Sequence, residues 1–225
     1  MDRDAVIFDM DGLMVDTEML AIEAWEAAAR AHGAEIPRAV CIGMIGLNQR
    51  DSEQLIADTL GAAFPLAAVR DEYLYRVQQR LDRGDVAAKP GLHELLDFLE
   101  ACSVRKAVAT SSARSDALKK LEAVGVLHRF PVLATADEVR RGKPAPDLFL
   151  LAAERLGVAP ARCTVLEDSE AGIRAAVAAG MRAVLVPDIK QPSESVAALA
   201  TRVCPSLIQV REMWAHENTL AAISQ

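Results

Sequence analysis

The chain has 225 residues, of which 52% are hydrophobic and 25% are charged, and its formal net charge is −7. This length and composition exclude a disordered chain and allow one large domain, or one domain with a smaller inserted one. An acidic balance without a basic cluster argues against a nucleic-acid partner, and no apolar run reaches the ~18 residues that a membrane span needs. The four cysteines form no CxxC pair, so we expect reduced thiols in a cytoplasmic protein.

Short apolar segments with the pattern of buried strands alternate with helical patterns along most of the chain. The predicted strands are residues 5–8, 105–110, 131–134, 163–167 and 182–187. Helical patterns separate the last four strands at residues 115–125, 146–157 and 169–180. This alternation predicts an α/β fold, a doubly wound, Rossmann-like parallel sheet with helices on both faces.

The segment that follows the first strand breaks this rhythm, because it is helical throughout. Its helical patterns cover residues 18–33, 50–61 and 67–84, and a helix at residues 91–102 leads back to the sheet. We therefore predict an α/β core of residues 1–14 and 86–225, and an all-helical domain of residues 15–85 inserted into it. The sequence has no heptad run and no long exposed apolar pattern, so we expect a monomer.

Polar and charged side chains follow the predicted strands at one edge of the sheet. The strand-end residues are Asp9, Asp11, Thr110, Ser111, Ser112, Glu167 and Asp168. Lys143 lies in a Gly/Pro loop at residues 140–147, directly before a predicted helix. Since ligands bind outside the carboxyl ends of the strands in open parallel sheets, this edge is the predicted site.

The residue types at this edge suit a magnesium ion and a phosphoryl group. Mg²⁺ prefers oxygen ligands and is usually held by one or two carboxylates together with a substrate phosphate. An ion beside Asp9 and Asp168 would offset the repulsion between the acids. Thr110, Lys143 and the amides of the turn that contains Gly12 are candidate donors to a phosphate. An aspartate can also be a nucleophile that forms an aspartyl-phosphate, and a second acid two residues on can act as general acid and base.

Each of these residues has an ordinary structural interpretation when it is taken alone. Asp16 and Thr17 are candidates to cap the helix that follows them, and Ser169 is a candidate to cap the helix that starts there. Lys143 on its own would be a solvated surface lysine. The combination, in this order and at strand ends, favours a functional site.

Two N-terminal motifs resemble those of the haloacid dehalogenase-like phosphohydrolases. DMDGLMVDTE at residues 9–18 resembles the first motif of that family, which implies that Asp9 is the nucleophile and Asp11 the acid and base. VATSS at residues 108–112 resembles the second, which places Thr110 on the transferring phosphoryl group. The neighbouring Ser111 and Ser112 become candidate substrate-binding residues.

Two later motifs complete the resemblance, which spans residues 9–168. GKPAPD at residues 142–147 is similar to the third motif, in which Lys143 steadies the charge of the nucleophile and the phosphate. LEDS at residues 166–169 is similar to the fourth, which implies that Glu167 and Asp168 hold Mg²⁺. In the family, Asp9 and the backbone carbonyl of Asp11 complete this ligand set. Each motif is weak alone, but the ordered set is specific.

The resemblance also implies that the inserted helices form a cap of the kind found in the β-phosphoglucomutase-like branch, which closes over the site and chooses the substrate. The mutases of this branch carry a histidine on the first cap helix, and alignment of DTEMLAIEAW (16–25) places Ala21 there. This departure favours a phosphatase that acts on a small phosphorylated metabolite, such as a sugar phosphate or a nucleotide-like compound, over a phosphosugar mutase.

Two cap residues are further candidates for substrate contact. Glu18 follows Asp-Thr, which looks like the pattern of sugar-phosphate and nucleotide phosphatases in this branch. MIGLNQRDS at residues 44–52 resembles the substrate loop of the cap. Arg50 in this loop is a candidate to bind a distal anionic or polar group, because a guanidinium binds such groups bidentately. It is equally well interpreted as a surface residue at a helix start.

Other classes of protein fit the residues less well. A phospho-receiver signalling domain also has an acidic Mg²⁺ site, a threonine and a lysine, but it is shorter and its first-strand acids are adjacent. A dehalogenase lacks the second acid of the first motif and needs no Mg²⁺. A non-catalytic binding protein is disfavoured because every motif residue is present. The sequence does not identify the substrate.

Overall fold

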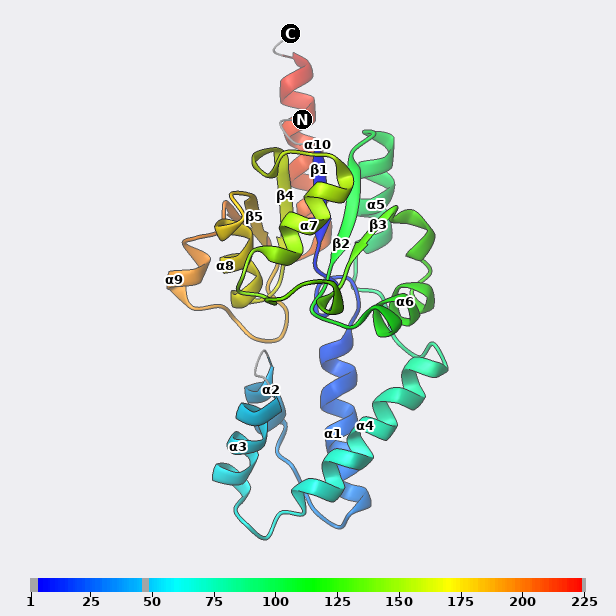
Figure 1. Cartoon of the computed structure of the whole chain (residues 1–225), viewed down its shortest axis with the longest axis vertical. Helices are drawn as coiled ribbons and strands as arrows, with labels where there is room; N and C mark the ends of the chain where they lie inside the picture. Colours follow the sequence, from blue (N-terminus) through cyan, green and yellow to red (C-terminus); the bar gives the residue numbers. More distant parts are fainter. Residues whose placement is uncertain (1–3, 46–48, 224–225) are drawn as a thin grey trace.

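Two groups of elements make up the computed structural model, which describes residues 4–45 and 49–223 (Figure 1). Six strands form one sheet with helices on both faces, and the first four helices lie together below the carboxyl edge of that sheet. We refer to residues 4–14 and 90–223 as the sheet body and to residues 17–82 as the helical body. Residues 46–48 of the predicted substrate loop lie outside the described residues.

The sheet has the predicted doubly wound, parallel arrangement. Its strands are β1 (Ala5–Phe8), β2 (Arg105–Ala109), β3 (Val132–Ala134), β4 (Cys163–Glu167), β5 (Arg182–Leu185) and β6 (Arg202–Val203). Their order across the sheet is β3-β2-β1-β4-β5-β6, and every pair is parallel. The direction in which strands are added therefore reverses between β1 and β4, and such a switch point is where open α/β sheets bind ligands. The sequence pattern misses β6, which has only two residues, both exposed.

Alternation along the strands divides the apolar residues of the sheet body between two cores. Val6 and Phe8 of β1 face one core, whereas Ala5 and Ile7 face the other. The helices on the first side are α5 (Leu92–Ala101), α6 (Arg114–Ala123) and α10 (Leu207–Ile223). Those on the second side are α7 (Asp147–Leu156), α8 (Glu170–Ala178) and α9 (Glu194–Ala197). Short 3-10 turns form at Leu127–Arg129, Ala136–Glu138 and Pro160–Arg162.

The helical body has a third core of its own. Its helices are α1 (Thr17–Ala31), α2 (Arg38–Met44), α3 (Gln49–Leu60) and α4 (Leu66–Asp82). Ile22 and Trp25 of α1 pack there with Ile56 of α3 and Val69 of α4. All predicted helices occur within two residues of their expected bounds, but α2 is not predicted, because it is a short helix that follows a proline.

The chain passes between the two bodies twice, and the crossing segments pair with each other. The N–H of Asp16 donates to the carbonyl of Ala87 at 2.9 Å, and an antiparallel bridge joins Val15 and Ala88. Asp16 occupies the N-cap position of α1, but its side chain makes no capping hydrogen bond. Its carboxylate lies 3.7 Å from the ammonium of Lys89 instead. The paired crossings keep the helical body next to the carboxyl end of β1.

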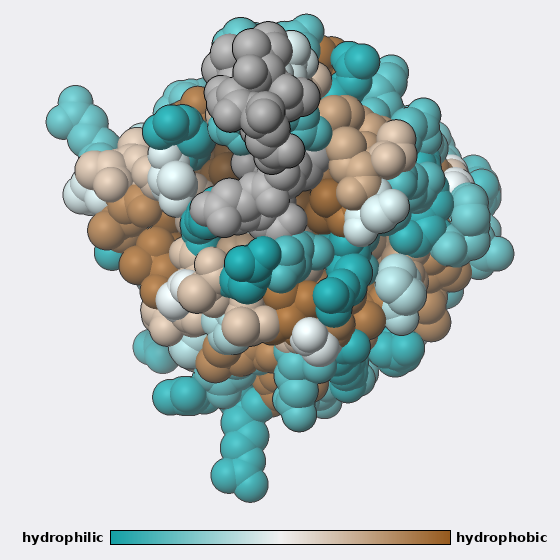
Figure 2. Space-filling model, turned by 90° about the horizontal axis from the view of Figure 1, so that it is seen from above, coloured by the Kyte–Doolittle hydropathy of each residue, from teal (hydrophilic) through white to brown (hydrophobic). Residues whose placement is uncertain are grey.

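Hydrophilic and hydrophobic residues are mixed on the end of the molecule that Figure 2 shows. Figure 2 shows the end of the molecule at which the chain termini lie, where hydrophobic residues are interspersed with hydrophilic ones. Within residues 4–45 and 49–223, no helix combines the length and the apolar character needed to cross a membrane.

Candidate active site

The carboxyl ends of β1, β2 and β4 meet at the switch point of the sheet. Phe8, the last residue of β1, pairs with Val108 of β2 on one side and with Leu166 of β4 on the other. The residues that follow these strands therefore enter one space, where a cavity of about 850 Å³ opens. The predicted site residues that line this cavity are Asp9, Asp11, Glu18, Thr110, Ser111, Lys143 and Asp168.

Lys143 is a buried cation at the centre of this site rather than a solvated lysine. Its side chain is only 5% exposed, and its ammonium contacts the carboxylate of Asp9. It also donates to Glu167 Oε1 at 2.7 Å and to the carbonyl of Ala109 at 3.1 Å. Burial alone would lower the pKa of Lys143, but the charges of Asp9 and Glu167 outweigh burial and raise it. The lysine therefore stays protonated between two carboxylates.

Three carboxylates surround this lysine and form a group that can hold a metal ion. One oxygen each of Asp9, Glu167 and Asp168 lies within 4.8 Å of the others. Burial, opposed by Lys143, raises the pKa of Asp9 to about 7, and the charge of Glu167 raises it further. Burial and the charge of Glu167 also raise the pKa of Asp168 well above its usual range.

The donor set of this group fits Mg²⁺. Glu167 is fully buried, and its Oε2 accepts from both the N–H and the hydroxyl of Ser169 at 2.8 Å. Burial is the main cause of the raised pKa values of Asp9 and Asp168, and the charge of Glu167 adds to it, because only one lysine lies among these three carboxylates. A hard divalent cation would supply the missing positive charge, and oxygen ligands are those that Mg²⁺ prefers.

Asp11 faces the same cavity but has different partners. Its Oδ1 accepts from Lys120 at 2.6 Å, and its Oδ2 accepts from the hydroxyl of Ser112 at 2.7 Å. The buried hydroxyl of Thr110 lies 3.4 Å from the same Oδ2. Burial works to raise the pKa of Asp11, but Lys120 outweighs it and lowers the pKa. In this arrangement Asp11 is paired with Lys120 and Ser112 and is not one of the three acids of the possible metal group.

Lys120 is a site residue that the sequence analysis misses. It lies on α6, eight residues after Ser112, and it reaches the site because α6 begins directly after the second motif. The position of Lys120 on the helix that directly follows the second motif is the signal that would have identified it as a site residue. A lysine in a helix with several other charged residues is otherwise the ordinary pattern of a solvated face.

Gly12 shapes the turn after β1 by making room for a carboxylate. It has a φ of +82°, and a Cβ at this position would lie 2.4 Å from Asp168 Oδ2. Its N–H donates to the carbonyl of Val15 at 2.9 Å, within the turn. The amide of Gly12 itself is therefore already engaged, and the expectation that amides of this turn donate to a phosphate stays a prediction.

The two candidates on the helical body differ in position. Glu18 lines the cavity, and burial together with the charge of Asp188 raises its pKa to about 7, with Lys89 opposing. Arg50 is exposed near the start of α3 and is not among the described residues that line the cavity. Its position agrees with the alternative interpretation, a surface residue at a helix start.

A doubly wound sheet with three carboxylates and a buried lysine at its switch point defines an α/β enzyme with an acidic site suited to a metal ion. The chain belongs to the haloacid dehalogenase-like hydrolases, whose family model matches residues 6–186. The family and the fold that the four motifs predict are therefore confirmed.

The relatives of this chain agree with the predicted class of enzyme, a phosphoric monoester hydrolase. It is 32% identical over 181 residues to the phosphorylated carbohydrates phosphatase of Thermotoga maritima, covering 80% of this chain and 83% of the relative. It is 36% identical over 181 residues to the fructose-1-phosphate phosphatase YqaB of Escherichia coli, covering 80% and 94%. A family hydrolase of Deinococcus radiodurans, solved with bound phosphate and sodium, superimposes with a TM-score of 0.84 at 29% identity, covering 96% of each chain.

Proposed function

We propose that this protein is a Mg²⁺-dependent phosphatase that hydrolyses a small phosphorylated metabolite through an aspartyl-phosphate. The observation that carries the proposal is the position of Lys143 between Asp9 and Glu167, with Asp168 in the same group. A buried nucleophile, a fixed positive charge and a set of oxygen ligands are what phosphoryl transfer requires. The named phosphatases among the relatives support the same reaction class.

In this proposal Asp9 attacks phosphorus and Asp11 moves the proton. The ammonium of Lys143 favours the carboxylate form of Asp9 and, with Thr110, binds the phosphoryl oxygens. Mg²⁺, held by Asp9, Glu167, Asp168 and the backbone carbonyl of Asp11, would offset the charge on the phosphoryl group. The P–O bond to the leaving alcohol breaks as a P–O bond to Asp9 forms, and the leaving oxygen takes a proton from Asp11. Asp11 then removes a proton from the water that hydrolyses the aspartyl-phosphate.

The contact between Asp11 and Lys120 belongs to the resting enzyme in this proposal. A carboxyl group whose pKa is lowered by a lysine at 2.6 Å is ionised near neutral pH, so in this contact it has no proton to donate. Asp11 must therefore leave Lys120 before it protonates the leaving group. Ser111 lines the cavity, and the hydroxyl of Ser112 donates to Asp11 at 2.7 Å, so both serines remain candidate substrate-binding residues in this proposal.

We propose that residues 15–85 act as a cap over this site. The paired crossings at Val15 and Ala88 place the helical body beside the cavity, and Glu18 of α1 forms part of the cavity wall. Ala21 lines a neighbouring cavity and carries no group that could restrain a water molecule. This favours hydrolysis over the mutase reaction, in which the phosphoryl group returns to the sugar.

Phosphate release from p-nitrophenyl phosphate tests this proposal. We expect turnover with Mg²⁺, loss of turnover with EDTA, and recovery when Mg²⁺ is restored. Asp9→Asn should lower kcat by about 10³-fold or more, because it removes the nucleophile. Asp4→Asn is the matched control, since Asp4 pairs with Arg162 outside the site and should keep full activity.

Two results would overturn parts of the proposal. Turnover that survives Asp9→Asn would exclude the aspartyl-phosphate. Conversion of a hexose 1-phosphate into its 6-phosphate isomer, without release of phosphate, would establish the mutase reaction instead.

A further inference from the structure

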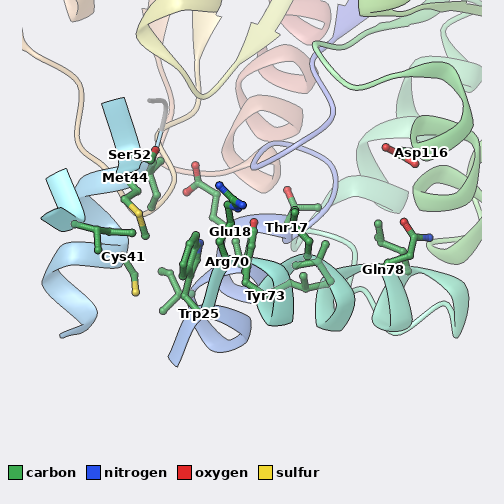
Figure 3. A pocket seen from close by; sticks show the side chains of 18 of the residues that line it. Thr17, Glu18, Trp25, Cys41, Met44, Ser52, Arg70, Tyr73, Gln78 and Asp116 are labelled. Atoms are coloured by element: carbon green, nitrogen blue, oxygen red, sulfur yellow. The ribbon is translucent and has the colours of Figure 1, made fainter. Parts of the chain in front are cut away.

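A second cavity, of about 780 Å³, lies between the helical body and the sheet body (Figure 3). Its walls come from α1, α2, α3 and α4, and Asp116 and Lys120 of α6 close it on the side of the sheet. Glu18 and Ile45 line both this cavity and the one at the switch point. The two spaces therefore adjoin, and the organic part of a phosphate ester bound at Asp9 has the second cavity next to it.

The second cavity is mainly apolar and aromatic. The rings of Trp25 and Tyr73 stack with their centroids 4.4 Å apart and their planes 14° from parallel. Figure 3 shows these two side chains next to each other, with Met44 and Cys41 on the neighbouring helix. Such walls gain free energy when they cover apolar surface and favour flat rings.

The positive charges on these walls are already neutralised. Among the described residues that line the cavity, the lysine and arginine side chains are those of Lys120 and Arg70. Lys120 contacts Asp11 at 2.6 Å, and Arg70 contacts Glu53 at 3.1 Å and Asp71 at 3.2 Å.

Acidic side chains on the same walls make the cavity unfavourable for an anion. Glu18, Glu53 and Asp116 all line it. A second phosphate or a carboxylate on the substrate would meet these acids without an unpaired cation to offset them, and like charges close together are costly to desolvate.

We propose that the second cavity receives the alcohol part of the substrate and selects a monophosphate ester whose alcohol carries a planar, uncharged, mainly apolar ring. This inference rests on the proposed phosphatase function. It assigns the cavity a selective role against sugar bisphosphates and other substrates with a second anionic group. The hydroxyl of Ser52 and the amide of Gln78 supply a few polar contacts on otherwise apolar walls.

Three esters with the same primary alkyl leaving oxygen test the substrate class, because their chemical reactivity is closely matched. They are ethyl phosphate, 2-phenylethyl phosphate and 2-(4-carboxyphenyl)ethyl phosphate. We expect kcat/KM for the phenylethyl ester to exceed that for the ethyl ester by at least about tenfold. The carboxylated ester should be at least about tenfold poorer than the phenylethyl ester. Equal values for the three esters, or a preference for the carboxylate, would overturn the inference.

Failure of the proposed function gives a different pattern of results. If neither p-nitrophenyl phosphate nor any of the three esters releases phosphate with Mg²⁺, the phosphatase itself is disproved. If all three esters are hydrolysed at similar kcat/KM, the phosphatase function is supported, but the proposed selectivity of the second cavity is disproved.

Two variants locate the selectivity in this cavity. Ala21→Phe fills it from α1, so the ratio of kcat/KM for the phenylethyl and ethyl esters should fall to about one. Ala27→Phe is the matched control on the same helix, because Ala27 is not among the described residues that line the cavity, and it should keep the ratio of the unmodified enzyme. A ratio that survives Ala21→Phe in a folded protein would contradict the assignment.

Glu53→Gln tests the charge argument independently. It removes a carboxylate that neutralises Arg70, so kcat/KM for the carboxylated ester should rise about tenfold relative to the phenylethyl ester. Glu72→Gln is the matched control, because Glu72 pairs at 2.7 Å with Arg76, which is not among the described residues of the cavity lining. No change in the ratio with Glu53→Gln would show that the pairing of Arg70 does not exclude anions.

Discussion

The position of Glu167, the last residue of β4, depends on Gly172 in the first turn of the next helix, α8. Gly172 of α8 lies so close that a Cβ there would be 1.7 Å from Glu167 Oε1 and 1.8 Å from its Cδ. The N–H of Gly172 also donates to the hydroxyl of Ser169 at 3.1 Å, and Ser169 in turn binds Glu167. A glycine in the first turn of a helix is therefore required by the buried carboxylate packed against it.

Gly172→Ala should displace Glu167 and weaken the metal site. We expect the Mg²⁺ concentration for half-maximal activation to rise about tenfold or more, as is usual when a residue that orients a metal ligand is changed. Mg²⁺ titration of phosphate release measures this directly. Val177→Ala, at an exposed position on the same helix, should leave the midpoint unchanged. An unaltered midpoint with Gly172→Ala would show that the helix moves away and Glu167 does not.

Glu138 links the turn that follows β3 to helix α7, on the far side of β2 from the site. It accepts from the N–H and the hydroxyl of Thr135 at 3.0 and 2.9 Å, and from Arg155 of α7 at 2.9 and 3.2 Å. The hydrogen bond from Arg155 is the main reason that the pKa of Glu138 falls to about 2, with burial opposing and Thr135 assisting. The folded protein therefore binds a proton here less readily than the unfolded chain does.

Glu138→Gln should destabilise the protein in a pH-dependent way. A lowered pKa in the folded state stabilises it above the unfolded pKa, near 4.5, and this contribution is lost as the pH falls towards 2. We expect a loss of about 1–2 kcal/mol at pH 7, which shrinks between pH 4.5 and 2. Urea unfolding of both proteins at pH 7, 4 and 3 measures the difference. The exposed Glu122→Gln should show no such trend, and a constant difference for Glu138→Gln would refute the linkage.

At the residue scale, the sequence predicts those site residues that belong to short motifs. Asp9 and Asp11 are two residues apart, and Glu167 and Asp168 are adjacent, so their strands carry them to one edge without further information. Lys120 reaches the site through a contact across 109 residues of chain. Gly172 is required because the side chain of Glu167 occupies the space of its Cβ, and no local sequence pattern predicts that contact.

At the scale of elements, Lys89 holds the crossing segments and the end of β5 together. Its N–H donates to the carbonyl of Met14 at 2.9 Å, and its ammonium contacts Asp188, which follows β5. Asp16 lies 3.7 Å from the same ammonium. Glu18 adds a further acid beside Asp188, and burial together with the charge of Asp188 raises the pKa of Glu18. One half-buried cation therefore compensates a group of acids at the junction of the two bodies.

Lys89→Met should destabilise the protein because it leaves these acids without a cation. The expected loss is about 3 kcal/mol in the free energy of unfolding, as for other buried ion pairs that lose one partner. Lys119→Met is the control, since Lys119 pairs with Asp82 at 2.7 Å but both side chains are exposed, and it should cost less than about 1 kcal/mol. Urea unfolding compares the two.

A second variant separates the charge from the packing of the lysine stem. Lys89→Met combined with Asp188→Asn should recover part of the loss, because one of the uncompensated charges is gone. A double variant no more stable than Lys89→Met alone would assign the effect to packing instead.

The elements that the sequence pattern misses are short or lack a single apolar stripe. β6 has two exposed residues, and α2 has seven residues after Pro37, so neither carries enough periodicity to be recognised. The 17-residue helix α10 buries Leu207, Val210 and Trp214, but its apolar residues are spread around the helix. The longer, clearly patterned helices and the strands with continuous apolar runs are the ones predicted within two residues.

At the scale of the whole molecule, the exposed large apolar side chains among the described residues do not form one continuous element face. They are Leu74, Tyr75, Leu150, Val177, Leu199, Val203 and Ile208, on α4, α7, α8, β6, α10 and a loop. Stable subunit interfaces need a contiguous apolar core, and the monomer expected from the sequence stays a prediction. The formal charge of −7 also opposes association of identical copies.

The two bodies have separate cores, and this separation should be visible in their stability. Ile56 is fully buried in the core of the helical body, and Leu166 is fully buried in the sheet body. Ile56→Ala and Leu166→Ala each remove similar apolar volume, at a cost of about 2–5 kcal/mol. If the two bodies open independently, Ile56→Ala should destabilise the helical body alone. The reason is that only two connecting segments, near Val15 and Ala88, join the two bodies.

Hydrogen exchange under native conditions distinguishes these cases. Ile56→Ala should speed exchange in the amides of α1, α3 and α4 and leave those of β1 and β4 protected. Leu166→Ala should speed exchange in both bodies, because α1 and α4 are anchored on the sheet through the crossings. If Ile56→Ala exposed β1 and β4 as much as α3, the two bodies would form one cooperative unit. The proposed role of the helical body as a cap requires the independent behaviour, because a cap must open for substrate and product without disturbing Asp9 and Lys143.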